Sequence, residues 1–168
     1  MRMATRADER PLYDLLVEMW GHNGNGWGYS FDPTLVIARI EAGTRPDPRQ
    51  RSNPNDQLRG VIGVIDSPRG LIGTIGLFSE PGMWFSQEHA LYEIWLYVKP
   101  KERRPEHTQA LRDFALWVHE KLKPAGSPYP YPLATGFVHV GSRFPTMQKV
   151  WQRLWPRARQ VGCLYWIE

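Results

Sequence analysis

Residues 90–122, ALYEIWLYVKPKERRPEHTQALRDFALWVHEKL, decide the fold of this 168-residue chain. The first part places apolar side chains on both faces of an extended segment, which predicts a buried strand. Pro100 has no amide donor and ends the strand, and a charged loop, residues 101–104, follows it. From Pro105 or Glu106 onward apolar residues recur at helical spacing and predict a helix to Leu122.

The faces of this strand and the loop behind it make the first functional prediction. Simple alternation puts Leu91, Glu93, Trp95 and Tyr97 on one face and Tyr92, Ile94, Leu96 and Val98 on the other. A strand that enters a helix through a tight loop aims the first helical amides, and the positive end of the helix dipole, just beyond the strand. Arg103 and Arg104 add positive charge there, so the predicted ligand group is a phosphate.

Val98-x-Pro100-x-x-Arg103 leading into a helix resembles the acyl-CoA-binding motif of the GNAT superfamily of N-acyltransferases, roughly V-x-P-x-x-[RQ]-x-x-G-x-[GA]. On that pattern Arg103 takes the Arg/Gln position, Glu106 the first Gly and Thr108 the Gly/Ala. The chain is more similar to a glycine-poor subgroup found largely in tailed phages, whose helix begins R-R-S-x-H-A-x-x-L. The residues that suit this subgroup are Arg103, Arg104, His107, Ala110, Leu111, Phe114 and Ala115, and before them Trp84, Phe85, Ser86 and Glu88.

This resemblance implies an α+β fold with α/β/α layers, in which about four helices flank a central mixed, mostly antiparallel twisted sheet. It also implies acetyl-CoA as cofactor, with pantetheine on the backbone of Leu96, Tyr97 and Val98 where two strands part at a bulge. The pyrophosphate would lie against Arg103, Arg104, Glu106, His107 and Thr108. The Glu106 carboxylate either points outward and favours the helix dipole, or intrudes on the anion.

Composition sets the outer limits of the interpretation. With 42% hydrophobic residues the chain is expected to form a single domain, residues 1–168. The longest apolar run is too short to span a bilayer, and MRMATRADER lacks the apolar part of a signal peptide, so a cytoplasmic protein is expected, with a virion left open. A single cysteine, Cys163, permits no internal disulfide, and no metal site is predicted. A net charge of +4 and a pI near 9.4 favour anionic partners.

The remaining elements follow in an order α, α, β, β, β, α, β, α, β, with the first strand of the superfamily either lost or folded into residues 1–4. Glycines 63, 73 and 76 indicate bulges or close backbone approach. Before the central strand, the predicted elements are a helix over 6–20 capped by Thr5 with Glu9 near a capping-box position, a glycine-rich loop over 21–30, a helix from Asp32 to Gly43 and a mobile basic loop over 44–57. A hairpin of 59–65 and 71–78 about a turn at 66–70 follows them. After the central helix, the predicted elements are a strand over 133–140, a helix from Thr146 to Pro156 and final strands in 157–168.

Acetyl transfer to an amine needs a base, because an ammonium has no lone pair. Glu93 is the candidate base, and the alternative is an ion-paired structural carboxylate. His89 and His139 are further candidates for the base. The superfamily's usual acid is a tyrosine in the last helix, where this chain has Trp151, so the thiolate would leave unaided, with a thiol pKa of about 8.5.

Two functions remain open. The first is an acetyl-CoA-dependent N-acetyltransferase acting on a primary amine of a small molecule, or on a protein lysine or N-terminus. Its acceptor would enter between residues 21–30, with Trp27, and residues 83–85, with Trp84. The second is a structural or binding protein that keeps the fold with little or no catalysis, such as a phage particle component or host-protein binder. Nucleic-acid binding through the basic loop rests on charge alone, and a homodimer or another protein partner is left open.

Overall fold

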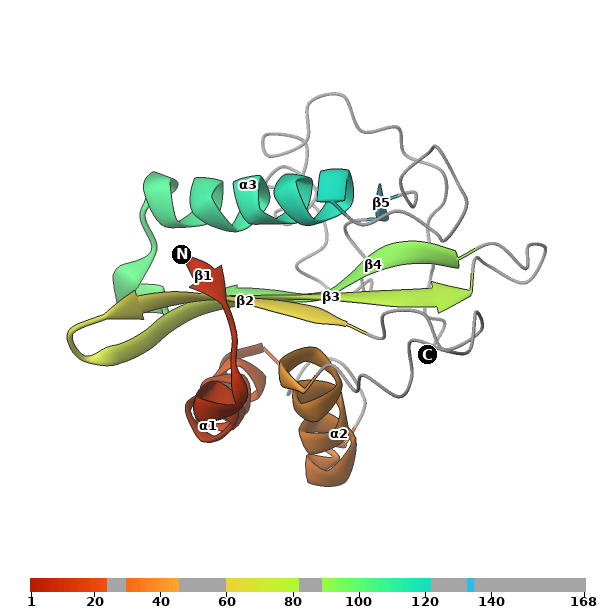
Figure 1. Ribbon diagram of the computed structural model, residues 1–168. Helices are drawn as coiled ribbons and strands as arrows, with labels where there is room; N and C mark the ends of the chain where they lie inside the picture. Colours follow the sequence, from red (N-terminus) through yellow and green to blue (C-terminus); the bar gives the residue numbers. More distant parts are fainter. Residues whose placement is uncertain (24–29, 46–59, 82–88, 122–132, 135–168) are drawn as a thin grey trace, which may run out of the picture.

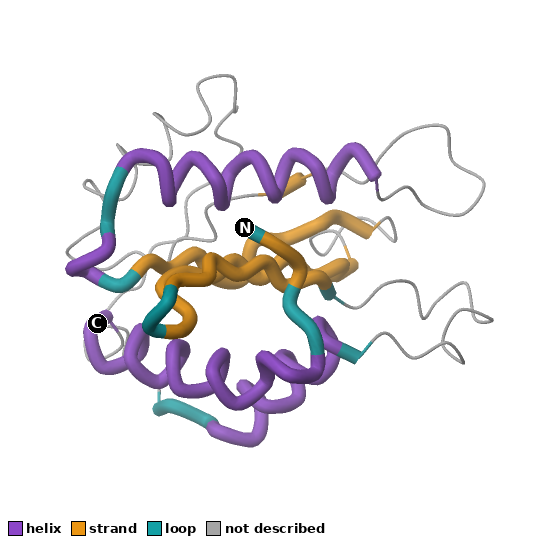
Figure 2. Tube along the Cα trace, turned by 60° about the vertical axis from the view of Figure 1, so that its left-hand side comes forward, coloured by secondary structure: helices purple, strands orange, loops and turns teal. Residues whose placement is uncertain are grey.

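In the computed structural model the described part of the chain forms a five-stranded sheet, which lies between a layer formed by α3 and a layer formed by α1 and α2 (Figure 1). The structure describes residues 1–23, 30–45, 60–81, 89–121 and 133–134, and Figure 2 shows the same layers from another side. The helices are α1 (Glu9–Asn23), α2 (Pro33–Thr44) and α3 (Pro105–Lys121), with 3-10 turns at Arg6–Asp8 and Pro100–Glu102. The strands are β1 (Arg2–Met3), β2 (Val61–Ser67), β3 (Gly70–Pro81), β4 (His89–Val98) and β5 (Leu133–Ala134).

The strand order in the sheet is β1-β2-β3-β4-β5. Pairing is antiparallel from β1 to β4 and parallel between β4 and β5, so the sheet is mixed and mostly antiparallel, as predicted. The first strand is present within residues 1–4, because Arg2 lies opposite Val64 and Met3 opposite Gly63. Three α-helices flank the sheet in the described part of the chain, and the helix predicted from Thr146 lies outside it.

Each face of the sheet has its own apolar core, which confirms that β4 is covered on both sides. The cluster under α3 includes Val61, Ile75, Leu77, Leu91, Val98, Leu111, Ala115 and Val118. The cluster against α1 and α2 includes Leu12, Leu16, Ile40, Ile62, Val64, Phe78, Trp95 and Tyr97. Each fully buried side chain of this size contributes roughly 1.5–3 kcal/mol, so both layers hold β4 firmly in place.

A bulge in β4 corrects the predicted assignment of its faces. Glu93 lies opposite Leu77 and Trp95 lies opposite Gly76, so Ile94 is an extra residue on β4. The extra residue reverses the alternation, which puts Glu93 on the α3 face with its partner Leu77. Trp95 and Tyr97 therefore pack on the opposite face, against α1 and α2, and do not share a face with Leu91 as simple alternation predicted.

Several element ends also differ from the predictions. The capping partner of Thr5 is Asp8, whose carboxylate accepts from the Thr5 amide at 2.8 Å, while Glu9 instead binds Thr44 and Arg45. Asp32 caps α2 as predicted, accepting from the amides of residues 34 and 35. Helix α1 continues to residue 23, into the predicted loop.

Gly43 is not the end of α2, which continues to Thr44. A Cβ at Gly43 would lie 2.5 Å from the Ile62 side chain, so the glycine allows close packing of the helix on the sheet. Thr44, predicted to begin the basic loop, is buried and helical, and residues 46–59 lie outside the described part. The β2–β3 turn is tighter than predicted, because β2 runs to Ser67 and β3 begins at Gly70, whose φ is +100°.

Candidate functional site

The site predicted from the sequence centres on one edge of β4. Strand β5 pairs with β4 at Leu91 and Tyr92, and no strand in the described part of the chain continues along that edge. The Lys99 amide donates to the Ile72 carbonyl of β3 at 2.9 Å. Because antiparallel pairing alternates, Tyr97 also turns its backbone groups to β3, and Leu96 and Val98 turn theirs to the open edge.

The three residues expected to pair with pantetheine therefore differ in what they offer. Leu96 presents both an amide and a carbonyl to the open edge, and Val98 presents its amide there. The Val98 carbonyl accepts a hydrogen bond of 3.1 Å from the Arg103 Nε. The Tyr97 backbone faces Thr74 instead, and its side chain is buried against α1. The cofactor-binding role of all three stays a prediction.

The loop after β4 is braced by Glu102. The Glu102 carboxylate binds the Arg69 guanidinium of the β2–β3 turn at 2.6 Å, and its amide donates to the Lys99 carbonyl at 2.8 Å. The His107 Nδ1 donates to the Glu102 carbonyl at 2.6 Å, which joins the loop to the first turn of α3. A loop fixed in this way needs little ordering when a ligand binds to it.

Two amides at the beginning of α3 are available to an anion. The amides of His107 and Thr108 both bond to the Arg104 carbonyl, at 3.1 and 3.4 Å. Pro105 has no amide, and within the described residues the amides of Arg104 and Glu106 make no hydrogen bond. These two donors lie at the positive end of the α3 dipole, which is the place predicted for the phosphates.

The charged side chains of this turn point largely to solvent. The Arg104 Nη1 and the Glu106 Oε1 are 3.9 Å apart, and their side chains are 65% and 63% exposed. Glu106 thus lies on the outer side of the turn beside Arg104, where it offsets part of that positive charge. The Thr108 hydroxyl makes a long contact of 3.5 Å with the Arg104 carbonyl.

Glu93, the candidate base, is 5% exposed and directly precedes the bulge. Its register partner Leu77 belongs to the apolar cluster under α3, while Ile94 is 43% exposed. A carboxylate in such surroundings costs free energy unless polar groups compensate it, so its presence indicates either a functional role or a structural polar contact.

A polar cluster on the opposite face of β4 was not predicted. The Tyr97 hydroxyl lies 3.2 Å from the Glu18 Oε1 and 3.0 Å from the His22 Nδ1, and the Lys99 Nζ lies 3.4 Å from the Glu18 Oε2. Burial, followed by the charge of Glu18, raises the pKa of Tyr97 to about 12, so this phenol stays protonated. The i, i+4 spacing of Glu18 and His22 was visible in the sequence, but their contact with a residue 75 or more positions away was not.

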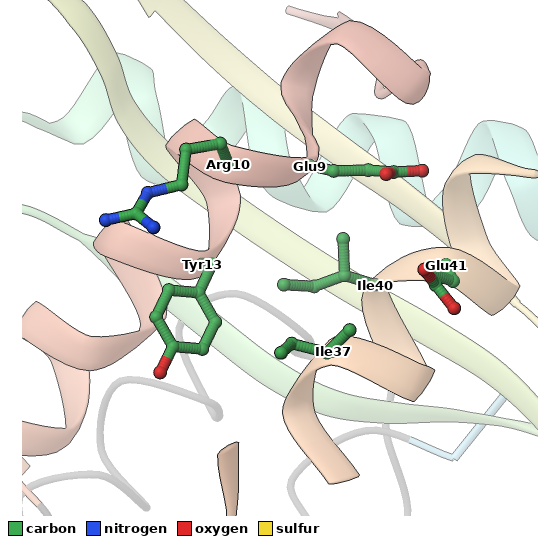
Figure 3. Close-up of a pocket in the computed structure, with 6 residues that line it drawn as sticks. All are labelled: Glu9, Arg10, Tyr13, Ile37, Ile40 and Glu41. Carbon is green, nitrogen blue, oxygen red and sulfur yellow. The ribbon is translucent and has the colours of Figure 1, made fainter. Parts of the chain in front are cut away.

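A shallow pocket of about 330 Å³ lies between α1 and α2 (Figure 3). Figure 3 shows Ile37 and Ile40 between the carboxylates of Glu9 and Glu41 on one side and Tyr13 and Arg10 on the other. Arg45 forms ion pairs with both carboxylates. None of the predicted site residues lines this pocket, so it is separate from the edge of β4.

Other predicted site residues lie outside the described part of the chain, namely Trp27, Trp84, His139 and Trp151, and so does the side chain of His89. Among the described residues no three His, Cys, Asp or Glu side chains form a group that could hold a metal ion. The described helices are also too short or too polar to cross a membrane.

No protein-family profile and no curated protein sequence matches this chain. Solved structures do match. A possible acetyltransferase from Clostridium difficile 630 superposes with a TM-score of 0.63 at 13% identity, over 99% of this chain and 95% of that one. The ribosomal-protein-alanine N-acetyltransferase of Brucella melitensis biovar Abortus 2308 superposes with a TM-score of 0.60 at 14% identity, over 99% of this chain and 97% of that one. The aminoglycoside N-acetyltransferase AAC(6')-Iy superposes with a TM-score of 0.65 at 13% identity, over 99% of this chain and 95% of that one.

Identities this low establish the shared fold and nothing finer. The predicted α+β fold of the GNAT acetyltransferases is therefore confirmed.

Proposed function

We propose that the chain is an acetyl-CoA-dependent N-acetyltransferase whose acceptor is a primary amine. The observation that carries this proposal is the edge of β4 at Leu96 and Val98, along which no strand lies in the described part of the chain. This edge leads directly into a loop held by Glu102 and to the first amides of α3. An extended cofactor with two amide groups and a pyrophosphate matches that sequence of donors and acceptors.

The matched structures support acetyl-CoA as the cofactor. AAC(6')-Iy was solved with CoA and with the bisubstrate analog CoA-S-monomethyl-acetylneamine. In this chain Leu96 and Val98 would pair with pantetheine, and Arg103 and Arg104 would face the phosphates with the Glu106 amide. His107 holds the loop through Glu102, and it would support the phosphate site in that way.

Glu93 is the proposed base at the reacting carbon. Glu93 directly precedes the bulge and follows the residues at which β4 pairs with β5, and the superfamily resemblance expects the thioester near this point. Glu93 would take the proton that the amine nitrogen loses after its bond to the acetyl carbon forms. The thiolate would leave unaided, because its conjugate acid has a pKa of about 8.5.

For the acceptor, we propose only a chemical class, the primary amines. The resemblance places the acceptor entrance near residues 21–30 and 83–85, most of which lie outside the described part. Among the matched structures one is named for ribosomal-protein alanine and others for aminoglycosides, so both a protein N-terminus and a small amine are acceptors to test. The finer likeness to the phage subgroup stays a hypothesis.

A second candidate is a structural or binding protein with this fold and no turnover. The observation that favours it is the composition of the α3 turn, where Pro105 removes an amide and the Glu106 carboxylate competes for Arg104. A weakened phosphate site is the change expected in a chain that no longer uses the cofactor.

Thermal melting with and without acetyl-CoA separates the two candidates. At a hundredfold its dissociation constant, acetyl-CoA should stabilise the enzyme by about 2.7 kcal/mol. Acetyl-pantetheine, which lacks the pyrophosphate, is the matched control and should stabilise much less. No shift in the melting temperature at millimolar acetyl-CoA would contradict the enzyme proposal.

A further inference from the structure

We infer that Arg69, in the turn between β2 and β3, is a positioning residue for the phosphates of the cofactor. Its guanidinium neutralises the Glu102 carboxylate, which would otherwise place a negative charge beside those phosphates. Arg69 acts through Glu102 and needs no contact of its own with the ligand. The inference rests on the proposed use of acetyl-CoA and adds to that site a residue from a distant part of the sequence.

The turn between β2 and β3 and the loop after β4 meet at one end of the sheet, where α3 begins (Figure 1). The Lys99 amide donates to the Ile72 carbonyl at 2.9 Å, so the loop starts beside the third residue of β3. The Arg69 Nη2 then lies 2.6 Å from the Glu102 Oε1, although the two positions are 33 residues apart in the sequence. The sheet register therefore brings a cation from one hairpin to the proposed phosphate loop.

The β2–β3 turn holds the backbone of Arg69 in a defined place. The Ser67 Oγ accepts from the Arg69 amide at 3.1 Å and donates to the Gly70 carbonyl at 2.9 Å. Gly70 has a φ of +100°, a conformation that residues with a Cβ rarely adopt. The arginine side chain therefore starts from a fixed point next to the loop after β4.

The negative charge of Glu102 lies close to the proposed phosphate site. Glu102 is two residues before Arg104, whose amide is one of the two available donors, and two residues of chain span at most about 7 Å. Charges interact over about 8 Å at physiological salt, so a carboxylate at Glu102 acts on an anion bound to that amide. A pyrophosphate carries negative charge, and an uncompensated carboxylate would repel it.

The pairing with Arg69 changes the charge balance of this loop. Residues 100–106 contain three basic and two acidic side chains, a net charge of +1, and Arg69 raises it to +2. The Glu102 side chain is 19% exposed, whereas the Glu106 side chain is 63% exposed. Arg69 therefore neutralises the carboxylate that water screens less effectively.

The ion pair should matter more for the ligand than for the fold. The Arg69 side chain is 81% exposed, and ion pairs with so exposed a partner contribute little to stability. Binding of the phosphates is different, because loss of Arg69 leaves a charge at Glu102 that acts directly on an anion. Removal of Arg69 should therefore weaken acetyl-CoA binding in a protein that is still folded.

The test is a double-mutant cycle on the affinity for acetyl-CoA, measured by calorimetric titration. Arg69→Gln should raise the dissociation constant roughly tenfold, because Glu102 keeps its charge. Glu102→Gln keeps an oxygen that accepts from Arg69 and removes the charge, so its dissociation constant should fall or stay within about threefold of the parent value. The double variant should also return to within about threefold of the parent, since both charges are gone.

Two controls separate the effect of charge from a change of structure. Arg10→Gln removes a side chain that is also 81% exposed and is paired with Asp14 on α1, and it should leave the affinity for acetyl-CoA unchanged. Salt at roughly 1 M, where charges interact over only about 3 Å, should abolish most of the loss in Arg69→Gln. Arg69→Lys keeps the charge and should bind acetyl-CoA nearly as the parent does.

The outcomes are distinct. Parent affinity in Arg69→Gln, or a double variant as weak as Arg69→Gln, would overturn the role of Arg69 and leave the proposed function standing. A loss that persists undiminished in high salt would also overturn it, because that loss would report a change in the shape of the loop. Absence of acetyl-CoA binding by the parent protein would instead overturn the proposed function, and with it the inference.

Discussion

The two faces of β4 hold their polar groups in different ways. On the α3 face Glu93 is 5% exposed and its register partner is an apolar leucine. On the α1 face the Tyr97 hydroxyl has two protein partners, and the exposed His22 connects it to solvent. A buried carboxylate costs free energy unless polar groups compensate it, whereas the buried Tyr97 hydroxyl keeps its hydrogen bonds within the protein. The single extra residue Ile94 puts Glu93 and Tyr97 on opposite faces of the sheet.

The largest expected effect is at Glu93. Glu93→Gln should lower turnover by about 10² to 10⁴ and leave acetyl-CoA binding nearly intact, because only the base is lost. The measurement is release of free CoA thiol across a panel of amines and lysine peptides, with denaturant melts alongside. A structural carboxylate would instead give a loss of about 1 to 3 kcal/mol in the free energy of unfolding. A fully active Gln variant would remove Glu93 as the base.

A smaller effect is expected at Arg103 and Arg104, which lie at the proposed phosphate site after β4. Replacing Arg103 and Arg104 together with Ala should raise the dissociation constant of CoA about thirtyfold, as loss of one good charge-assisted hydrogen bond would. The fold should survive, because both side chains are exposed and the double variant loses only the Arg103 bond to the Val98 carbonyl and the exposed ion pair between Arg104 and Glu106. Arg6→Ala/Arg10→Ala removes the same charge from another surface and serves as the control. Calorimetric titration giving equal affinity for both variants would exclude this phosphate site.

Gly76 tests the packing of the α1 face alone. A Cβ at this position would lie 2.4 Å from the Trp95 ring, so Gly76→Ala should lower the free energy of unfolding by about 1 to 3 kcal/mol. Urea denaturation measures the change. Gly21→Ala is the control, because a Cβ there meets no described atom within 4 Å and alanine favours the helix. A neutral Gly76→Ala variant would show that Trp95 can move without disturbing β4.

The smallest effect is the pH dependence at Tyr97. Its pKa is raised from 10.0 to about 12 in the folded protein, so the unfolded chain ionises first as the pH rises. The stability from this shift is complete below about pH 10 and is lost as the pH rises toward 12. Partial hydration of the polar cluster formed by Tyr97, Glu18 and His22 limits the stabilisation from this shift to about 1 kcal/mol. Urea melts from pH 9 to 12 should lose stability less steeply for Tyr97→Phe, and parallel curves would contradict the burial of this hydroxyl.

The strand, loop and helix around Pro100 could be predicted because each depends on local pattern. Alternation, a proline without an amide and helical spacing all lie within residues 90–122, and the resemblance to acyltransferases rests on the same residues. The fold followed from this unit, and the solved structures confirm it.

The register of the sheet could not be predicted in this way. A bulge at Ile94 exists only relative to β3, so counting along β4 put Leu91 and Trp95 on one face. The contact of Tyr97 with His22 spans 75 residues and depends on where α1 lies on the sheet. Gly43 was predicted to end the helix, because glycine often does so. Glycine is needed at this position because the Ile62 side chain lies close to it, and that tertiary contact is not visible in the local sequence.

Within the described residues β5 pairs with β4 only at Leu91 and Tyr92, and this also bears on how the protein behaves without a ligand. A strand edge with free amides and carbonyls is a template on which any extended peptide can add a strand. Proline or lysine at Leu96 would block such a peptide, but each would also weaken the proposed pairing with pantetheine. The Arg103 guanidinium on the Val98 carbonyl covers one acceptor of this edge without altering the strand. Bound cofactor would then cover the rest of this edge. Self-association of the folded protein through this strand should therefore rise when the cofactor is depleted.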